Sequence, residues 1–111
     1  MKRFQLCRLE EVPDGGSHGF SVEIDSSLLE LFLVRQADRL YAYSNSCPHT
    51  GGPLDWTPDQ FLDLDGKFIQ CATHDALFTI QDGRCIAGPC VGERLKALDV
   101  QLEGECVWLT V

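Results

Sequence analysis

Two short segments of this 111-residue chain each place a histidine close behind a cysteine. The first is CPHTGGPL, residues 47–54, and the second is CATHDALF, residues 71–78. A thiolate and an imidazole so near in sequence can point at the same place from a tight loop, and the glycines and prolines let the first segment wrap an inorganic core. Two cysteines with two histidines suit tetrahedral zinc or a [2Fe–2S] cluster in which histidine replaces cysteine on one iron. The candidate ligands are therefore Cys47, His49, Cys71 and His74.

The spacing within the two pairs bears on which chemistry they serve. Structural zinc sites usually pair cysteines about two to four residues apart and histidines about three to five apart, whereas each pair here is mixed. A single Cys–His pair is more often a buried thiol beside a core histidine, but two such pairs in loops edged by glycine and proline argue against coincidence. A nucleophilic Cys–His enzyme would use one pair and leave the other idle. Zinc and iron–sulfur thus remain the two metal alternatives at this point.

The full pattern resembles that of the Rieske iron–sulfur proteins. It reads C-x-H…C-x-x-H, with 21 residues between His49 and Cys71. Gly51 and Leu54 match the family's C-x-H-x-G-x-x-L, and Phe78 matches its aromatic residue after the second pair. The turn at 82–83 and Gly88-Pro89 resemble the turn and the proline loop that follow in the family. The resemblance runs from about residue 35 to residue 98 and more loosely over the rest.

The resemblance implies a division of labour among the four ligands. Cys47 and Cys71 would hold one iron through thiolates, while His49 and His74 would hold the other near the tip of the protein. The implied function is one-electron relay by a Rieske-type ferredoxin, from a reductase to an oxygenase or another terminal oxidoreductase, with no catalytic residues of its own. Two alternatives are the small subunit of an assimilatory nitrite reductase and, from a different class, a zinc-stabilised interaction module.

The sequence departs from some relatives at positions near the predicted cluster. Gly52 and Thr73 stand where members in the cytochrome bc complexes carry a bracing disulfide. Ala76 and Phe78 stand where those members place serine and tyrosine hydroxyls against the cluster. Because such donors raise the reduction potential, we expect a value towards the low end of the roughly −150 to +300 mV Rieske range. Asp75 replaces a common glycine, and its carboxylate could either act on His74 or dock a basic partner.

The elements that must position these loops are mostly short strands. Period-two alternation or apolar runs predict strands at residues 4–6, 20–24, 31–34, 40–43, 68–71, 77–80, 98–102 and 107–111. Residues 36–39 are expected to connect a hairpin as a four-residue loop, Asp82-Gly83 to form a tight turn and 103–105 to turn the last hairpin. Weak helix signals occur only at 26–30 and 57–61. The sequence predicts an all-β fold, a Rieske-like small antiparallel β-sandwich or barrel with a two-loop cluster-binding subdomain.

Length and composition fit this view. One domain spanning residues 1–111 is expected, with the cluster-binding part at about 44–90. A net charge of −8 makes nucleic acid and membrane surfaces poor partners. The N-terminus lacks the apolar run of a signal peptide, and no stretch approaches the roughly 18 apolar residues of a membrane helix. These features predict a cytoplasmic protein in which cysteines stay reduced.

The remaining residues with chemical potential have simpler interpretations. With three histidines in all, only His18 is left after the cluster, so a second iron site of the oxygenase type is excluded. His18 is expected to be a solvent-facing loop residue. The other cysteines are interpreted as small hydrophobic residues and the tyrosines and tryptophans as core or core-edge residues. These residues are Cys7, Cys85, Cys90, Cys106, Tyr41, Tyr43, Trp56 and Trp108.

Overall fold

The computed structural model describes residues 3–37, 39–46, 54, 61–63, 65–71, 76–88 and 91–110. In chain order the elements are β1 (Arg3–Arg8), the 3-10 helix η1 (Leu9–Glu11), β2 (Ser17–Ile24), β3 (Ser27–Gln36), β4 (Arg39–Ser44), β5 (Phe68–Gln70), β6 (Leu77–Thr79), β7 (Cys85–Ala87), β8 (Ala97–Glu103) and β9 (Cys106–Thr110). The predicted all-β fold is confirmed. Within the described ranges, no helix has the length and apolar character needed to span a bilayer.

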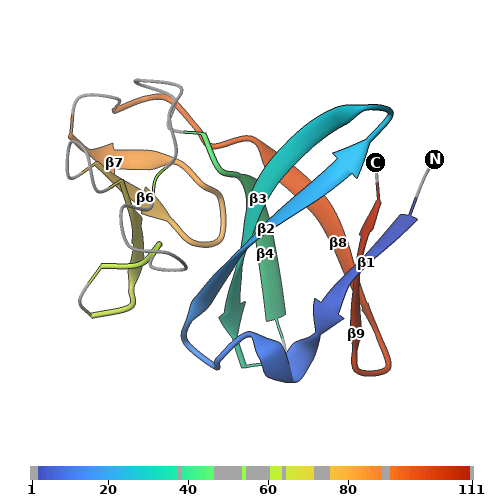
Figure 1. Ribbon diagram of the computed structural model, residues 1–111. Helices are drawn as coiled ribbons and strands as arrows, with labels where there is room; N and C mark the ends of the chain where they lie inside the picture. Colours follow the sequence, from blue (N-terminus) through green and yellow to red (C-terminus); the bar gives the residue numbers. More distant parts are fainter. Residues whose placement is uncertain are drawn as a thin grey trace.

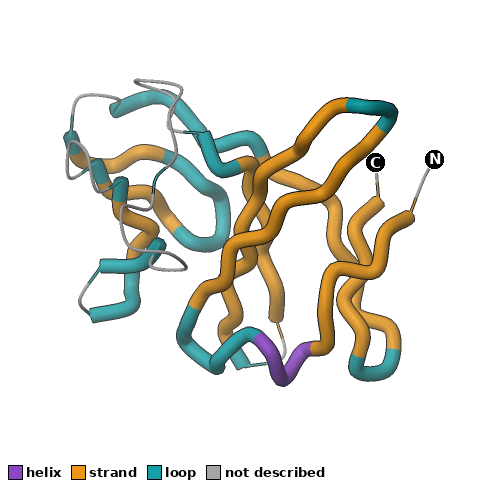
Figure 2. Tube along the Cα trace, viewed as in Figure 1, coloured by secondary structure: helices purple, strands orange, loops and turns teal. Residues whose placement is uncertain are grey.

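The strands form two antiparallel sheets. The larger sheet has the order β1-β9-β8-β4-β3-β2 and curls into a nearly closed barrel, while β5-β6-β7 form a small separate sheet. Figure 1 shows the small sheet at one end of the molecule and both chain termini at the opposite side of the barrel. In Figure 2, several of the described loops lie beside the small sheet. Cys71 directly follows β5 and Ala76 directly precedes β6, so the described ends of the second predicted ligand segment adjoin the small sheet.

Strand β3 explains how the two parts are joined. Its residues Leu31-Phe32-Leu33-Val34 are all fully buried. Since successive side chains on a strand point to opposite faces, Leu31 and Leu33 enter the barrel core, whereas Phe32 and Val34 belong to a second core that includes residues of the small sheet. A strand covered on both faces reads as an unbroken apolar run. This is why β3 lacks the period-two pattern of its neighbours.

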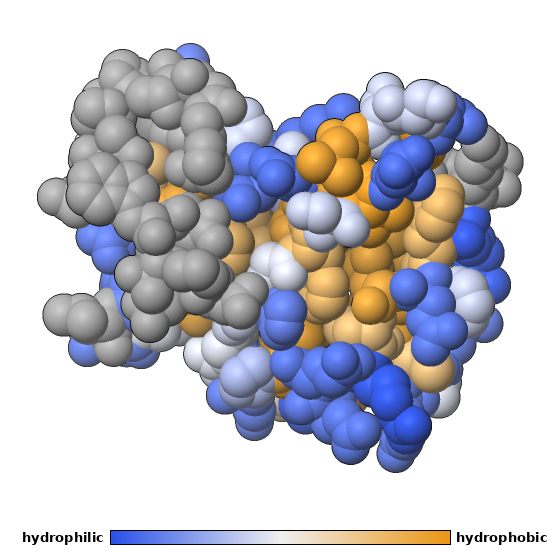
Figure 3. Space-filling view, in the orientation of Figure 1, coloured by the Kyte–Doolittle hydropathy of each residue, from blue (hydrophilic) through white to orange (hydrophobic). Residues whose placement is uncertain are grey.

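The barrel core is less completely covered beside β1 and β2, the edge strands of the larger sheet. Val12, Ala42, Val107 and Leu109 are buried inside it. Apart from the buried Cys7, the outer strands β1 and β2 contribute side chains that are only partly buried, namely Phe4, Leu6, Phe20 and Val22. Figure 3 shows apolar residues gathered on this face of the barrel half, with hydrophilic residues around them. The incomplete cover follows from β1 and β2 being the two ends of one sheet.

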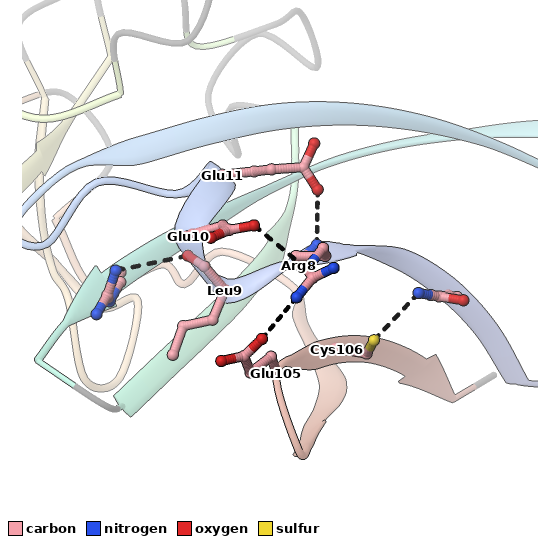
Figure 4. A network of polar contacts seen from close by, with 8 residues as sticks. Arg8, Leu9, Glu10, Glu11, Glu105 and Cys106 are labelled. Carbon is pink, nitrogen blue, oxygen red and sulfur yellow. Dashed lines mark hydrogen bonds and ion pairs between the residues drawn. The ribbon is translucent and has the colours of Figure 1, made fainter.

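A polar network ties η1 to the neighbouring strands, as Figure 4 shows. The Arg8 guanidinium lies 2.6 Å from Glu105 Oε2 and 3.3 Å from Glu10 Oε1, and the Arg8 amide donates to Glu11 Oε2 at 2.7 Å. Arg35 on β3 donates to the carbonyl oxygen of Val12 at 3.1 Å, just after η1. Because the charged side chains are exposed, these ion pairs orient the chain more than they stabilise it.

Two local predictions are wrong, and a third is largely untested. The connection between β3 and β4 is shorter than the four residues predicted, since Gln36 and Arg39 pair across the strands. The weak helix signal at 26–30 belongs instead to β3, which follows a two-residue turn with positive φ at Asp25 and Ser26. The other helix signal, at 57–61, falls outside the described residues except for Phe61, which is in no helix.

His18 is also placed differently from the prediction. It lies within β2, opposite Leu33, and its ring stacks on Phe20 at 4.5 Å. The glycine-rich sequence around it suggests a loop, but cross-strand pairing with β3 holds this stretch extended. Burial does support the interpretation of the described cysteines and aromatic residues, because Cys7, Cys85 and Tyr43 are buried and Tyr41, Trp108 and Cys106 are half-buried. Trp56 and Cys90 lie outside the described residues.

Candidate metal centre

The segment that carries Cys47 and His49 leaves the barrel from the end of β4. The two residues lie outside the described part of the chain, but both ends of their segment are described. At the near end, the amide of Asn45 donates to the Glu30 carbonyl at 2.9 Å. At the far end, the amide of Leu54 donates to the side-chain Oδ1 of Asn45 at 2.8 Å. The segment is thus closed at its base by one side chain.

The second predicted pair sits on the hairpin between β5 and β6. Its cysteine, Cys71, is described and fully buried, whereas His74 lies outside the described residues. The Cys71 amide donates to the Ala76 carbonyl at 2.9 Å, and Gln70 pairs with Leu77 in the strands below. This hairpin loop is therefore also closed at its base.

The bases of the two segments meet in one buried cluster. Leu54, Cys71 and Ala76 are all fully buried and belong to the same core as Phe61 and Phe78. The structure thus brings together the points from which Cys47, His49 and His74 extend, with Cys71 itself inside an apolar environment. A thiolate in such surroundings is shielded from water and is a good ligand for iron–sulfur or zinc.

A third segment reaches this core after β7. Gly88 has φ of +98°, and a Cβ built on it would lie 2.8 Å from the Cα of Ala76. Only glycine permits both that conformation and that approach. The Cys85 thiol donates to the Ala87 carbonyl at 3.2 Å, which fixes the chain just before Gly88. Gly88 thus lies against the base of the second loop, although Pro89 and Cys90 fall outside the described residues.

Tyr43 fastens the small sheet to the barrel. Its ring lies so close to Gly83, in the turn between β6 and β7, that a Cβ there would be 2.6 Å from Cε1. Its hydroxyl donates to the Ile80 carbonyl at 2.6 Å. Burial, with smaller contributions from Asp82 and Tyr41, raises the pKa of Tyr43 to about 12. The phenol therefore stays a donor at physiological pH.

Comparison with known proteins decides between the metal alternatives. Residues 2–102 match the family described as Rieske [2Fe-2S] domain. The chain belongs to the Rieske [2Fe–2S] family. The family confirms the predicted [2Fe–2S] cofactor and speaks against the zinc interpretation.

Similar Rieske proteins are ferredoxins of dioxygenase systems. The chain is 32% identical to the ferredoxin component of the naphthalene 1,2-dioxygenase system of Pseudomonas aeruginosa, covering 97% of this chain and 94% of that one. It is 27% identical to the biphenyl dioxygenase ferredoxin subunit of Pseudomonas sp. strain KKS102, over 93% and 86% of the two chains. The solved ferredoxin of carbazole 1,9a-dioxygenase from Nocardioides aromaticivorans IC177 superposes with a TM-score of 0.76 at 25% identity, over 99% and 98% of the chains. The prediction of an electron-carrying Rieske ferredoxin is confirmed.

The described residues fit a Rieske cluster. One predicted thiolate ligand, Cys71, lies in an apolar core, and the bases of the two ligand-bearing segments adjoin it. Two side chains that follow the second pair, Ala76 and Phe78, are apolar and fully buried. Such an environment excludes water and supplies no hydroxyl donor from these two positions.

Two features that position these segments are not evident from the sequence. The sequence predicts only a packing role for Tyr43, because its hydroxyl bond to Ile80 depends on a contact between residues 37 positions apart. For Asn45 the sequence gives only a weak signal, since asparagine at the start of a loop often accepts a nearby main-chain N–H. By contrast, the resemblance at Gly88-Pro89 does single out Gly88, which lies against Ala76.

Proposed function

We propose that this protein carries single electrons from a reductase to the terminal oxygenase of a dioxygenase system that acts on aromatic compounds. The observation that carries the proposal is the full-length similarity to the ferredoxin component of the naphthalene system. The sequence similarity to the biphenyl ferredoxin subunit and the structural similarity to the carbazole ferredoxin support the same partner class. The nitrite reductase alternative has less support, because all three of these relatives belong to dioxygenase systems.

The cluster ligands in this proposal are Cys47, His49, Cys71 and His74. When bound, the cluster supplies reversible one-electron chemistry, and the two neutral imidazoles make its reduced form easier to reach than four thiolates would. The chain's own contribution is to hold the ligands and keep water away. Supporting observations are the buried position of Cys71 and the closure of both ligand-bearing segments at their bases.

The domain boundaries and the cellular location belong to the same proposal. We take residues 1–111 as a single Rieske-type domain with its cluster-binding part at about 44–90. The shared core between β3 and the small sheet supports one unit. We place the protein in the cytoplasm, where reduced cysteines and soluble redox partners are the norm.

Spectroscopy and metal analysis of the purified protein test the proposal. We expect a brown protein with two irons per chain that bleaches on reduction and shows the electron paramagnetic resonance signal of a histidine-ligated cluster. A colourless protein that holds one zinc, and that cannot be reconstituted with iron and sulfide, would contradict it. Transfer to the terminal oxygenase of the naphthalene system, followed as reoxidation of the reduced chain, tests the partner class.

Single substitutions test the ligand set. His49→Cys and His74→Cys should each lower the reduction potential towards that of plant-type ferredoxins, about −400 mV, or cause loss of the cluster. Cys71→Ser should lose the cluster. His18→Ala is the matched control, because His18 stacks on Phe20 in β2 and is not one of the predicted ligands. If His18→Ala changed the signal and His49→Cys did not, the ligand assignment would be wrong.

A further inference from the structure

Asn45 links the two ends of the segment that carries Cys47 and His49. Its side-chain Oδ1 accepts a hydrogen bond of 2.8 Å from the amide of Leu54, nine positions further on. Leu54 is fully buried in the core that also contains Cys71. A main-chain N–H at such a residue needs an acceptor, and here a side chain provides it.

The near end of the segment is fixed without this side chain. The Asn45 amide donates to Glu30 on β3 and the Ser44 amide donates to the Lys96 carbonyl, both at 2.9 Å. A substitution at Asn45 that keeps the main chain in place therefore removes the link to Leu54 and leaves the attachment to the barrel. The expected effect of the substitution is therefore to open the segment between Asn45 and Leu54.

The structure contains a matched bond elsewhere in the same part of the molecule. Asp63 Oδ1 accepts hydrogen bonds from the amides of Lys67 at 2.9 Å and Phe68 at 3.2 Å. Asp63 thus closes a short turn in the same manner as Asn45, because its side-chain oxygen accepts hydrogen bonds from main-chain N–H groups. That turn carries none of the four predicted ligands, so Asp63 separates general loop closure from an effect on the cluster.

We propose that Asn45 is a positioning residue for the iron–sulfur cluster, whose side-chain oxygen holds Leu54 and thereby sets the placement of Cys47 and His49. The inference rests on the proposed function, since it takes these two residues as ligands. Ligand atoms must be held within a few tenths of an ångström for a metal site to be retained. Residues that orient ligands without touching the metal commonly change metal affinity by about 10–100-fold.

The test measures how fast the purified holoprotein releases iron to excess chelator, followed by the loss of visible absorbance. Four proteins are compared: wild type, Asn45→Ala, Asn45→Asp and Asp63→Ala. We expect release at least about tenfold faster from Asn45→Ala, while Asn45→Asp, which keeps the acceptor oxygen, stays within about threefold of wild type. Asp63→Ala should also stay within about threefold. The resonance signal of the reduced cluster should broaden in Asn45→Ala alone.

The outcomes separate this inference from the proposed function. If wild type holds no histidine-ligated cluster, the proposed function fails. If wild type is normal but Asn45→Ala releases iron at the wild-type rate, or Asp63→Ala releases it equally fast, the positioning role is wrong. The same holds if Asn45→Asp is no better than Asn45→Ala. Should the alanine variant yield no folded protein, Asn45→Gln, whose oxygen is displaced by one methylene, replaces it under the same criteria.

Discussion

The hydroxyl of Tyr43 donates a 2.6 Å hydrogen bond to the carbonyl of Ile80, and this bond joins the barrel to the small sheet. Tyr43 lies on β4, four residues before Cys47, while Ile80 directly follows β6. The bond therefore connects the strand that enters the first ligand-bearing segment with the strand that leaves the second. It fixes β4 relative to the end of β6.

Removing the Tyr43 hydroxyl should destabilise the protein. Tyr43→Phe keeps the ring against Gly83 but leaves the Ile80 carbonyl without this donor, which we expect to lower the free energy of unfolding by about 1–2 kcal/mol. Urea unfolding followed by circular dichroism measures the change. An unchanged midpoint would show that water replaces the hydroxyl without cost.

The same residue predicts a loss of stability in alkaline solution. The pKa of Tyr43 is raised from 10.0 to about 12, mainly by burial, so the folded state keeps a proton that the unfolded state releases above pH 10. The contribution of Tyr43 is complete below pH 10 and is lost as the pH rises towards about 12. Unfolding free energies across this range should fall less steeply in Tyr43→Phe than in wild type. Burial, with contributions from Glu11 and Cys106, also raises the pKa of Cys7 to about 11. Because Cys7 is the same in wild type and Tyr43→Phe, its titration does not account for the difference between them.

Gly83 and Gly104 form a matched pair for measuring the cost of the Tyr43 contact. Their φ values are +66° and +63°, but a Cβ at Gly83 would lie 2.6 Å from the Tyr43 ring, whereas none of the described atoms lies within 4 Å of one at Gly104. We expect Gly104→Ala to cost about 1 kcal/mol for the left-handed backbone and Gly83→Ala about 2–4 kcal/mol. Thermal unfolding of both variants supplies the comparison. Equal losses would mean that the tyrosine ring moves aside freely.

Gly88 and Gly92 provide a similar pair, of which Gly88 lies against the base of the second loop. Their φ values are +98° and +96°, yet only the Cβ of Gly88 would meet described atoms, with Ala76 Cα at 2.8 Å. Because the obstacle is main chain, Gly88→Ala should move this segment away from the second loop and speed iron loss by about tenfold. Gly92→Ala should introduce only backbone strain, and the variant should lose iron at close to the wild-type rate. Chelator-driven bleaching measures both, and equal rates would contradict the role given to Gly88.

The apolar surroundings of Cys71 predict a low reduction potential. Ala76 and Phe78 are fully buried and offer no hydroxyl to the cluster, so we expect a midpoint below 0 mV in a redox titration. Ala76→Ser introduces one donor, and a hydrogen bond of about 1–1.5 kcal/mol corresponds to a rise of about 40–60 mV. A positive wild-type midpoint would contradict the expectation, as would a fall in Ala76→Ser.

The sequence predicted most of the strands because their apolar periodicity is local. It failed where a residue's state depends on a distant partner. Ser17–Gly19 looks like a loop until β3 pairs with it, and residues 26–30 look weakly helical until the turn at Asp25 and Ser26 directs them back along β2. The four predicted ligands follow from residue type and spacing, and of these Cys71 alone falls within the described residues. The bond from Leu54 to Asn45 was not predictable, since it exists only once the segment has closed.

The double burial of β3 bears on any attempt to transplant the electron-carrying part into another protein. Phe32 stacks on Phe61 at 4.3 Å and lies 5.9 Å from Tyr43, so residues 44–90 cut out alone would lose the surface against which they fold. A portable unit must include β3 and β4 together with the strands that cover the other face of β3. Exchange between homologous carriers is therefore better attempted by swapping single ligand-bearing segments, with Phe32, Val34 and Tyr43 kept as a fixed platform.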